Sequence, residues 1–94
     1  MPNDNKVLKH GLTIVIPAYN EENAIESTVI KCHEVLSSYG NLPFEIIVVD
    51  DGSSDRTAER VPTDKCILLK HPKNYGYGRS LHLGINNAKF PYIG

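Results

Sequence analysis

Acidic residues gather directly after two apolar runs of the chain. Glu21 and Glu22 follow the first run, and Asp50, Asp51 and Asp55 follow the second. Neither cluster contains a lysine or arginine, so this pattern is poorly suited to holding a bare phosphate. Carboxylates can instead accept hydrogen bonds from nucleobase N–H groups or ribose hydroxyls, or bind a divalent cation. We therefore expect a site that selects hydrogen-bond donors.

Helix capping is the alternative explanation for the polar residues in these clusters. Asn20 is a plausible N-cap for the helix after the first run, and Ser53 or Ser54 can cap a helix after the second. Capping requires no ligand, because the side chains only satisfy free backbone N–H groups. We favour capping for Glu22 and Asp55.

Asp51 is the residue for which we favour ligand binding. Asp50 and Asp51 place two like charges side by side at the end of an apolar run, just before Gly52. Neighbouring like charges cost free energy, and capping alone does not demand two of them.

A glycine-rich segment at residues 74–79 is the third candidate. A dinucleotide-binding G-x-G-x-x-G motif fails here, because its third glycine would fall on Leu81, and the chain has no phosphate-binding G-x-x-x-x-G-K-[ST] loop. The glycines still permit close backbone approach. Arg79 is placed to reach a pyrophosphate or a base edge, although a solvated surface arginine is an equally good interpretation.

The elements that position these residues follow from the apolar pattern. Short apolar runs without polar alternation predict strands buried on both faces of a parallel sheet, and helical spacing predicts helices between them. The expected elements are a strand at 12–16, a helix from 20 to about 40, a strand at 44–49, a short helix before 62, a strand at 66–69, a helix from 76 to 88 and the entry to a strand at 91–94. Gly84 inside the last helix predicts close packing on the sheet.

This alternation predicts an α/β fold with a doubly wound, mostly parallel, Rossmann-like sheet of three to four strands and flanking helices. Ligands of such sheets bind beyond the carboxyl ends of the strands. The loops at 17–21 and 50–53 should therefore share one crevice.

Composition limits the function classes. The 94 residues fit one small domain at 11–94 after a loose leader at 1–10, and the net charge of −1 without a basic run argues against nucleic acid as a partner. The chain has no signal-peptide pattern or membrane-length apolar run, which makes the cytoplasm the expected compartment. Cys32 and Cys66 are expected to be reduced core thiols, and no histidine is assigned a catalytic role.

Three motifs together resemble the family-2 inverting glycosyltransferases, which have the A-type (GT-A) nucleotide-sugar transferase fold. They are IVIPAYNEE at 14–22, IVVDDGSSDRT at 47–57 and NYG at 74–76, with Gly84 downstream. The nearest subgroup comprises dolichyl-phosphate-mannose synthase-like and bacterial polyprenyl or polysaccharide transferases. The resemblance runs from about Leu12 to Gly94. Tyr77 and Ser80 depart from it, because many relatives have lysine and alanine there.

The resemblance implies a nucleotide-binding site and a donor. The expected nucleotide-binding residues are Pro17, Ala18, Tyr19, Glu21, Asp50, Asp51, Gly52 and Arg79. Of these, Arg79 is expected from its place in the sequence and not from the resemblance. The implied donor is a UDP- or GDP-linked sugar, and the implied acceptor is a lipid phosphate or a saccharide.

The resemblance also implies Mg²⁺ or Mn²⁺, held by a D-x-D motif, and a general base for the whole enzyme. We expect both to lie beyond residue 94, so no catalytic residue and no metal ligand is assigned here. The chain alone is then expected to bind nucleotide without catalysing transfer. Any membrane association, at the cytoplasmic face, would need the part beyond residue 94.

Two other classes compete with this interpretation. A non-catalytic α/β nucleotide-binding or structural module would use the acids only as caps and the glycines only in turns. A sugar nucleotidyltransferase is disfavoured, because the glycine-rich phosphate loop and basic residues expected after the first strand are absent.

Overall fold

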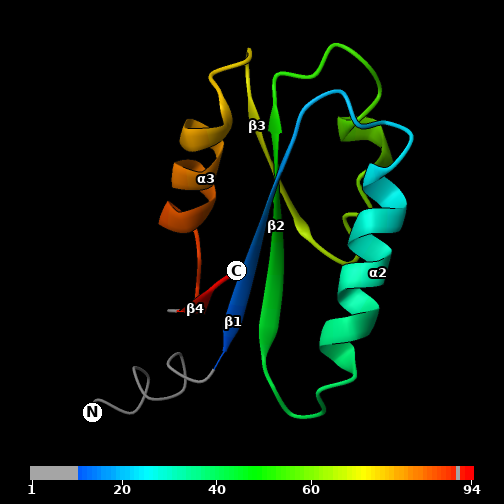
Figure 1. The fold of residues 1–94 in the computed structure, drawn as a ribbon, viewed down its shortest axis with the longest axis vertical. Coiled ribbons are helices and arrows are strands. Elements are labelled where there is room, and N and C mark those ends of the chain that lie inside the picture. Colours follow the sequence, from blue (N-terminus) through cyan, green and yellow to red (C-terminus); the bar gives the residue numbers. More distant parts are fainter. Residues whose placement is uncertain (1–10, 91) are drawn as a thin grey trace.

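The computed structural model describes residues 11–90 and 92–94, and in this part of the chain four parallel strands form one sheet (Figure 1). The strands are β1 (Leu12–Ala18), β2 (Phe44–Asp51), β3 (Ile67–His71) and β4 (Tyr92–Ile93), in the order β3-β2-β1-β4. The chain passes from β1 to β3 in one direction and then returns to the far side of β1. The expected doubly wound α/β sheet is thus confirmed; the expected leader at 1–10 lies outside the described residues.

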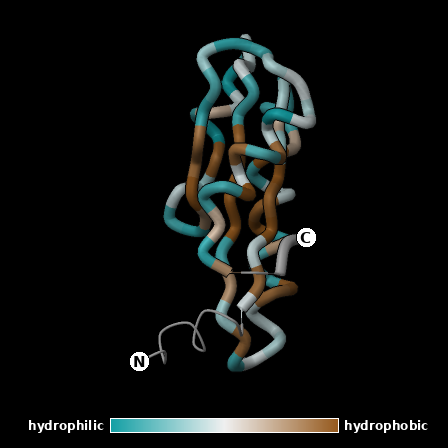
Figure 2. The backbone as a smooth tube through the Cα atoms, turned by 90° about the vertical axis from the view of Figure 1, so that its left-hand side faces the viewer, coloured by the Kyte–Doolittle hydropathy of each residue, from teal (hydrophilic) through white to brown (hydrophobic). Residues whose placement is uncertain are grey.

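Helices cover both faces of the sheet. Helix α2 (Ile25–Ser37) packs on one face in a core that includes Ile46 and Val48, and α3 (Tyr77–Asn86) packs on the other face with Ile47 and Val49. These four residues of β2 are at most 1% exposed. Figure 2 shows the apolar strands at the centre and the hydrophilic loops at the ends. The buried strand inferred from residues 44–49 is therefore one of the two inner strands of the sheet.

Several element boundaries differ from the sequence prediction. Strand β1 continues through Pro17 to Ala18, which pair with Val49 and Asp50 of β2, whereas the expected strand ended at residue 16. Strand β2 includes both aspartates. The N-cap of helix α2 is Ala24, four residues after the expected N-cap Asn20, and the predicted short helix is a single 3₁₀ turn, η1 (Ala58–Arg60).

Gly84 packs directly on the sheet, as the sequence predicted. A methyl group at this position would overlap the side chain of Val15 on β1. We expect Gly84→Ala to lower the free energy of unfolding by about 1–3 kcal/mol, because overpacking outweighs the better helix propensity of alanine.

Gly78 supplies the matched control for this prediction. It lies in the same helix, and a methyl group there would meet no atom within 4 Å. Gly78→Ala should be neutral or stabilising in the same urea titration. Equal effects of the two substitutions would contradict the packing argument.

Both cysteines are free thiols packed beside the core under α2, which agrees with the prediction of reduced thiols. Burial, with a contribution from Asp64, raises the pKa of the Cys66 thiol to about 11. At pH 8 only about one such thiol in a thousand is a thiolate. We expect iodoacetamide to modify Cys66 far more slowly in the folded chain than in urea; equal rates would show that the thiol is accessible and ionised.

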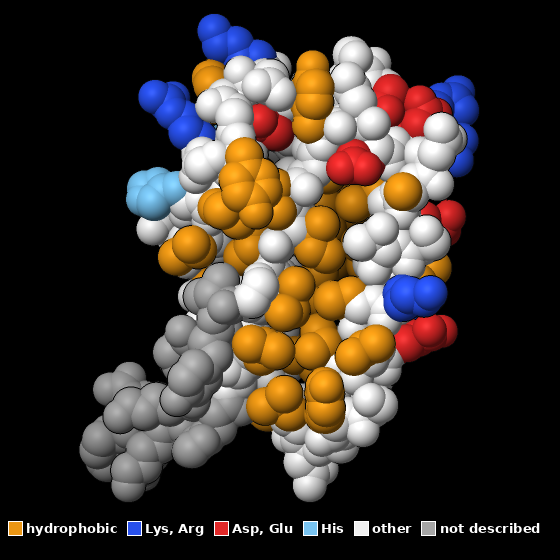
Figure 3. Space-filling model, viewed as in Figure 1, with side chains coloured by type: hydrophobic (Ala, Val, Ile, Leu, Met, Phe, Trp, Pro, Cys, Tyr) orange, Lys and Arg blue, Asp and Glu red, His pale blue; other side chains and the backbone are white. Residues whose placement is uncertain are grey.

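An open apolar groove of about 510 Å³ runs between β1 and α2. Its lining includes Leu12, Ile14, Val35 and Tyr39, and the apolar side chains on this face are visible in Figure 3. Among residues 11–90 and 92–94, no helix is long and apolar enough to span a membrane.

Candidate functional site

A pocket of about 390 Å³ opens at the carboxyl ends of β1 and β2. It is lined by Pro17, Ala18, Tyr19, Glu21, Asp51, Asn74, Gly76, Tyr77 and Ser80. Its volume lies within the usual range for small-molecule sites, and its place is where open α/β sheets bind ligands. The structure therefore brings five of the eight expected nucleotide-binding residues into one cavity.

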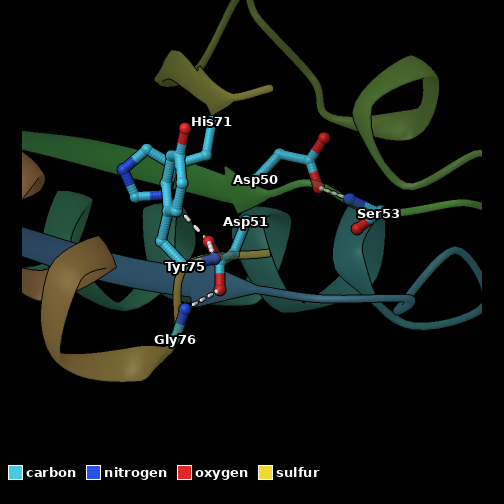
Figure 4. A network of polar contacts seen from close by, with 6 residues as sticks. All are labelled: Asp50, Asp51, Ser53, His71, Tyr75 and Gly76. Carbon is cyan, nitrogen blue, oxygen red and sulfur yellow. Dashed lines mark hydrogen bonds and ion pairs between the residues drawn. The ribbon is translucent and has the colours of Figure 1, made fainter. Parts of the chain in front are cut away.

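Asp51 lies at the inner end of this pocket and is only 4% exposed. Its carboxylate accepts hydrogen bonds from the backbone N–H of Tyr75 at 2.9 Å and of Gly76 at 2.8 Å, and from Nδ1 of His71 at 2.8 Å (Figure 4). Gly76 has φ 104°, which few other residues adopt, and it directly precedes α3. Asp51 thus fixes the loop that forms one wall of the pocket.

Burial and hydrogen bonding act in opposite directions on Asp51. Burial raises the pKa of its carboxyl, but the hydrogen bonds from Tyr75, His71 and Gly76 outweigh it and hold the pKa below 3.8. Asp51 is therefore ionised at neutral pH. An ionised carboxylate accepts hydrogen bonds and donates none, and its oxygens have more acceptor positions than these three donors use.

Asp50 and Gly52 flank Asp51 but do not line the pocket. Side chains alternate along a strand, so Asp50 points to the α2 face, where its Oδ1 accepts the backbone N–H of Ser53 at 3.2 Å (Figure 4). Each carboxylate of the pair thus has its own donors. The cost of two adjacent acids is offset within the protein, and it does not by itself require a ligand.

Five hydrogen bonds join the loop after β1 to the loop after β2, one of them from Oγ of Ser54 to Oδ1 of Asn20 at 3.3 Å. Asn20 exchanges bonds with the second loop: its N–H donates to Oγ of Ser53 and its Oδ1 accepts the N–H of Ser54, both at 2.9 Å. The N–H of Glu21 donates to Oγ1 of Thr57 at 2.7 Å, and the N–H of Glu22 donates to Asp55 at 3.2 Å. The polar residues of the two motifs thus hold one wall of the pocket together.

These contacts correct the predicted helix caps. Asn20 has a positive φ of 51° and does not cap α2, whose N-cap, Ala24, has no side-chain bond. Ser53 and Ser54 likewise cap no helix. Asp55 does accept hydrogen bonds from backbone N–H groups, as the capping interpretation predicts. The donors, however, are Glu22 and Thr57, so Asp55 joins the two loops.

The buried hydroxyl of Thr57 is central to this loop contact, because it bonds both the Glu21 N–H and the carboxylate of Asp55. Thr57→Val would leave the Glu21 N–H without its acceptor at nearly unchanged volume. We expect a loss of about 1–3 kcal/mol in unfolding free energy. Chemical denaturation tests this, with Thr63→Val on the surface as the control; similar midpoints for both variants would contradict it.

Arg79 lies away from the pocket. It lines a separate depression with His71, and its guanidinium lies 5.6 Å from the ring centroid of Tyr75. The side chain is mostly exposed on α3. Of the expected nucleotide-binding residues, Asp50, Gly52 and Arg79 are therefore not part of the cavity that the other five line.

Sequence reasoning missed His71, and although it named the segment 74–79 as a candidate, it assigned no individual site role to Asn74, Gly76, Tyr77 or Ser80. A signal for His71 existed, since the last residues of neighbouring parallel strands lie together, and Asp51 and His71 are paired in the register of β2 and β3. The other four residues come from the loop before α3 and its first turn. No local pattern shows that this loop turns back over the end of β1.

Within residues 11–90 and 92–94, no group of three or more histidine, cysteine, aspartate or glutamate side chains could hold a metal ion. The described residues therefore do not fit the divalent cation that the resemblance implies.

The fold is that of an α/β protein with a pocket at the carboxyl edge of a parallel sheet. A family model for glycosyl transferase family 2 matches residues 13–94. The chain belongs to this family.

Named relatives and a solved structure agree with this assignment. An undecaprenyl-phosphate 4-deoxy-4-formamido-L-arabinose transferase of Pectobacterium carotovorum is 37% identical over 88 residues, which cover 83% of this chain and 25% of that protein. A dolichyl-phosphate beta-glucosyltransferase of Trichomonas vaginalis is 40% identical over 86 residues, 82% of this chain and 26% of that protein. The structure of Staphylococcus aureus TarS 1–349 matches with a TM-score of 0.68 at 21% identity, over 88% of this chain and 26% of that one, and shows the same GT-A-like fold. The chain spans about a third or less of the curated relatives' length.

Proposed function

We propose that the pocket binds the nucleoside of a nucleotide-sugar donor and that the whole protein is an inverting glycosyltransferase. The observation that carries the proposal is the ionised, acceptor-only Asp51 at the inner end of a pocket whose rim bears Tyr19 and Tyr77. A flat base can lie between aromatic rings while its N–H donates to a buried carboxylate. Uracil and guanine both present such a ring N–H, so the proposed donors are UDP- and GDP-linked sugars.

The acidic lining supports binding of the nucleoside and disfavours the diphosphate in the same place. Glu21 and Asp51 contribute carboxylates to the pocket, and no lysine or arginine lines it. The diphosphate and sugar would therefore extend out of the cavity. We propose a lipid phosphate or a saccharide as the acceptor, because named relatives are lipid-phosphate transferases.

Two further parts of the proposal concern the whole enzyme. A divalent Mg²⁺ or Mn²⁺ ion is proposed on the family resemblance alone; the described residues supply no site for it, and no step is derived through it. The proposed place of the reaction is the cytoplasmic side, where nucleotide sugars would reach the pocket.

Amide NMR during titration with UDP, GDP, CDP and ADP tests the proposal. We expect UDP or GDP to shift signals of residues 18–21, 51 and 74–80 with saturation. A structural module without a nucleotide site would show no saturable shifts with any of the four nucleotides, and this result would sink the proposal.

Asp51→Asn gives a second test, because a purely structural role of Asp51 would not produce the expected change in nucleotide preference. Asparagine offers an N–H donor in place of one acceptor, and cytosine has a ring acceptor where uracil has its N–H. The preference for UDP over CDP should therefore fall or reverse in this variant. Asp64→Asn, on an exposed loop, should keep the wild-type preference.

A further inference from the structure

Ser80 is the one buried side chain in the described part of the molecule whose polar atom has no partner. It is 0% exposed, lies in the first half of α3 and lines the pocket, yet its Oγ makes no hydrogen bond with any described residue. Burying an unpaired hydroxyl costs free energy, and most such groups in proteins find a partner. Its position therefore needs an explanation.

The local backbone does not supply that partner. Serine inside a helix often donates to the carbonyl four residues earlier, which here is the carbonyl of Gly76. This carbonyl accepts the backbone N–H of Ser80 at 3.1 Å, and the hydroxyl does not bond to it. Residues four apart share a helix face, so Ser80 faces the sheet together with Gly84. Ser80 thus lines the pocket and carries a hydroxyl that has no partner among the described residues.

Ser80 and Asp51 are the buried polar residues of the pocket lining, whereas Tyr19 and Tyr77 are 48% and 70% exposed. A carboxylate can only accept, and a hydroxyl can donate or accept. In uracil and guanine, the ring N–H that a carboxylate would accept stands next to a ring carbonyl, which is an acceptor for a hydroxyl. The hydrogen-bonding types of the two buried groups, one acceptor and one possible donor, suit these neighbouring positions.

We propose that Ser80 is a base-contacting residue, which donates a hydrogen bond to the ring carbonyl beside the N–H taken by Asp51. This inference rests on the proposed nucleoside site and deepens it. In glycosyltransferases with alanine at this position the contact would be missing. Ser80 would therefore contribute to base selection in this chain specifically.

Isothermal titration of the 94-residue chain with UDP and GDP, compared with Ser80→Ala, tests the proposal. The substitution removes only the hydroxyl, so we expect affinity for the preferred nucleotide to fall about tenfold. The unliganded variant should unfold at the same or a higher temperature, because a buried unpaired group has been removed. Ser27→Ala, on the exposed side of α2, is the control that should leave affinity unchanged.

Two further measurements separate hydrogen bonding from shape and base from ribose. Ser80→Cys keeps the side-chain size but donates only weakly, and it should lose affinity like the alanine variant. The difference in affinity between the wild-type chain and Ser80→Ala should be smaller for an analogue in which sulfur replaces the contacted carbonyl oxygen. Such analogues are 2-thio-UDP, 4-thio-UDP and 6-thio-GDP. A ribose contact would leave the loss unchanged with all of these analogues and would overturn the assignment to the base.

The outcomes also distinguish this inference from the proposed function. If the wild-type chain binds UDP or GDP and Ser80→Ala binds them equally well, the hydroxyl makes no contact with the nucleotide. The inference about Ser80 then fails, and the proposed nucleotide site stands. If the folded wild-type chain binds none of the nucleotides, both fail. Thermal unfolding of each variant shows whether it is folded.

Discussion

Replacing Asp51 with alanine is expected to abolish measurable nucleotide binding and to lower the free energy of unfolding by about 3 kcal/mol. The substitution leaves two backbone donors, of Tyr75 and Gly76, and Nδ1 of His71 without their acceptor. Each buried donor left unpaired costs about 1–3 kcal/mol. A domain of this size is stable by only about 5–14 kcal/mol, so urea denaturation should detect the change easily.

The same variant should alter the pH dependence of stability. The pKa values of Asp51 and Asp55 are lower in the folded chain than the ordinary 3.8. Their stabilisation is therefore complete above the unfolded-state pKa and is lost as the pH falls through the folded-state values. Asp51→Ala should flatten the loss of stability below about pH 4, whereas Asp64→Ala on the surface should keep the wild-type slope. A wild-type slope in Asp51→Ala would show that the carboxylate is not held as described.

Replacing Gly52 with alanine is expected to destabilise the fold by more than about 3 kcal/mol. Gly52 has φ 71°, and a methyl group there would overlap the backbone of Lys73 and Asn74. Backbone atoms cannot move aside as a flexible side chain can, and the left-handed conformation adds its own strain. Circular dichroism during thermal unfolding should show a large fall in the midpoint.

Gly40 separates the two causes of this loss. It also has a positive φ, 75°, but a methyl group there would meet no atom within 4 Å. Gly40→Ala should therefore cost only the conformational part, about 1–2 kcal/mol. If both variants unfolded at the same temperature, the close approach of residues 73 and 74 to Gly52 would not be what requires the glycine.

The fold could be predicted from the sequence to a large extent, because it depends on signals that are local. The apolar run at 44–49 predicted a buried strand, and Gly84 predicted close packing of the last helix on the sheet, which the structure shows against Val15. The strand ends were less accurate, since β1 continues past Ile16 to Pro17 and Ala18, which pair with Val49 and Asp50 of β2. That pairing depends on residues more than 30 positions away, which no local pattern reports.

The site could be predicted only in part, for a similar reason. The loop after β1 and the end of β2 were expected to share a crevice, and residues 17–19, Glu21 and Asp51 do line one pocket. The use of Asn20, Asp55 and Thr57 as contacts between loops was not expected, because capping explains the same residue types equally well. Ser80 was noted only as a departure from relatives; its significance depends on burial, which only the structure gives.

The two aspartates at the end of β2 point to opposite faces and hold different segments. Asp50 holds the turn that bonds to the loop after β1, and Asp51 holds the loop before α3. Backbone amides in the middle of a central strand are among the last to exchange with solvent, because they open only when the whole domain unfolds. Both walls of the pocket are thus attached to the end of β2, a buried inner strand, so we expect a local opening of either loop to leave its attachment point in place and the cavity to re-form without refolding.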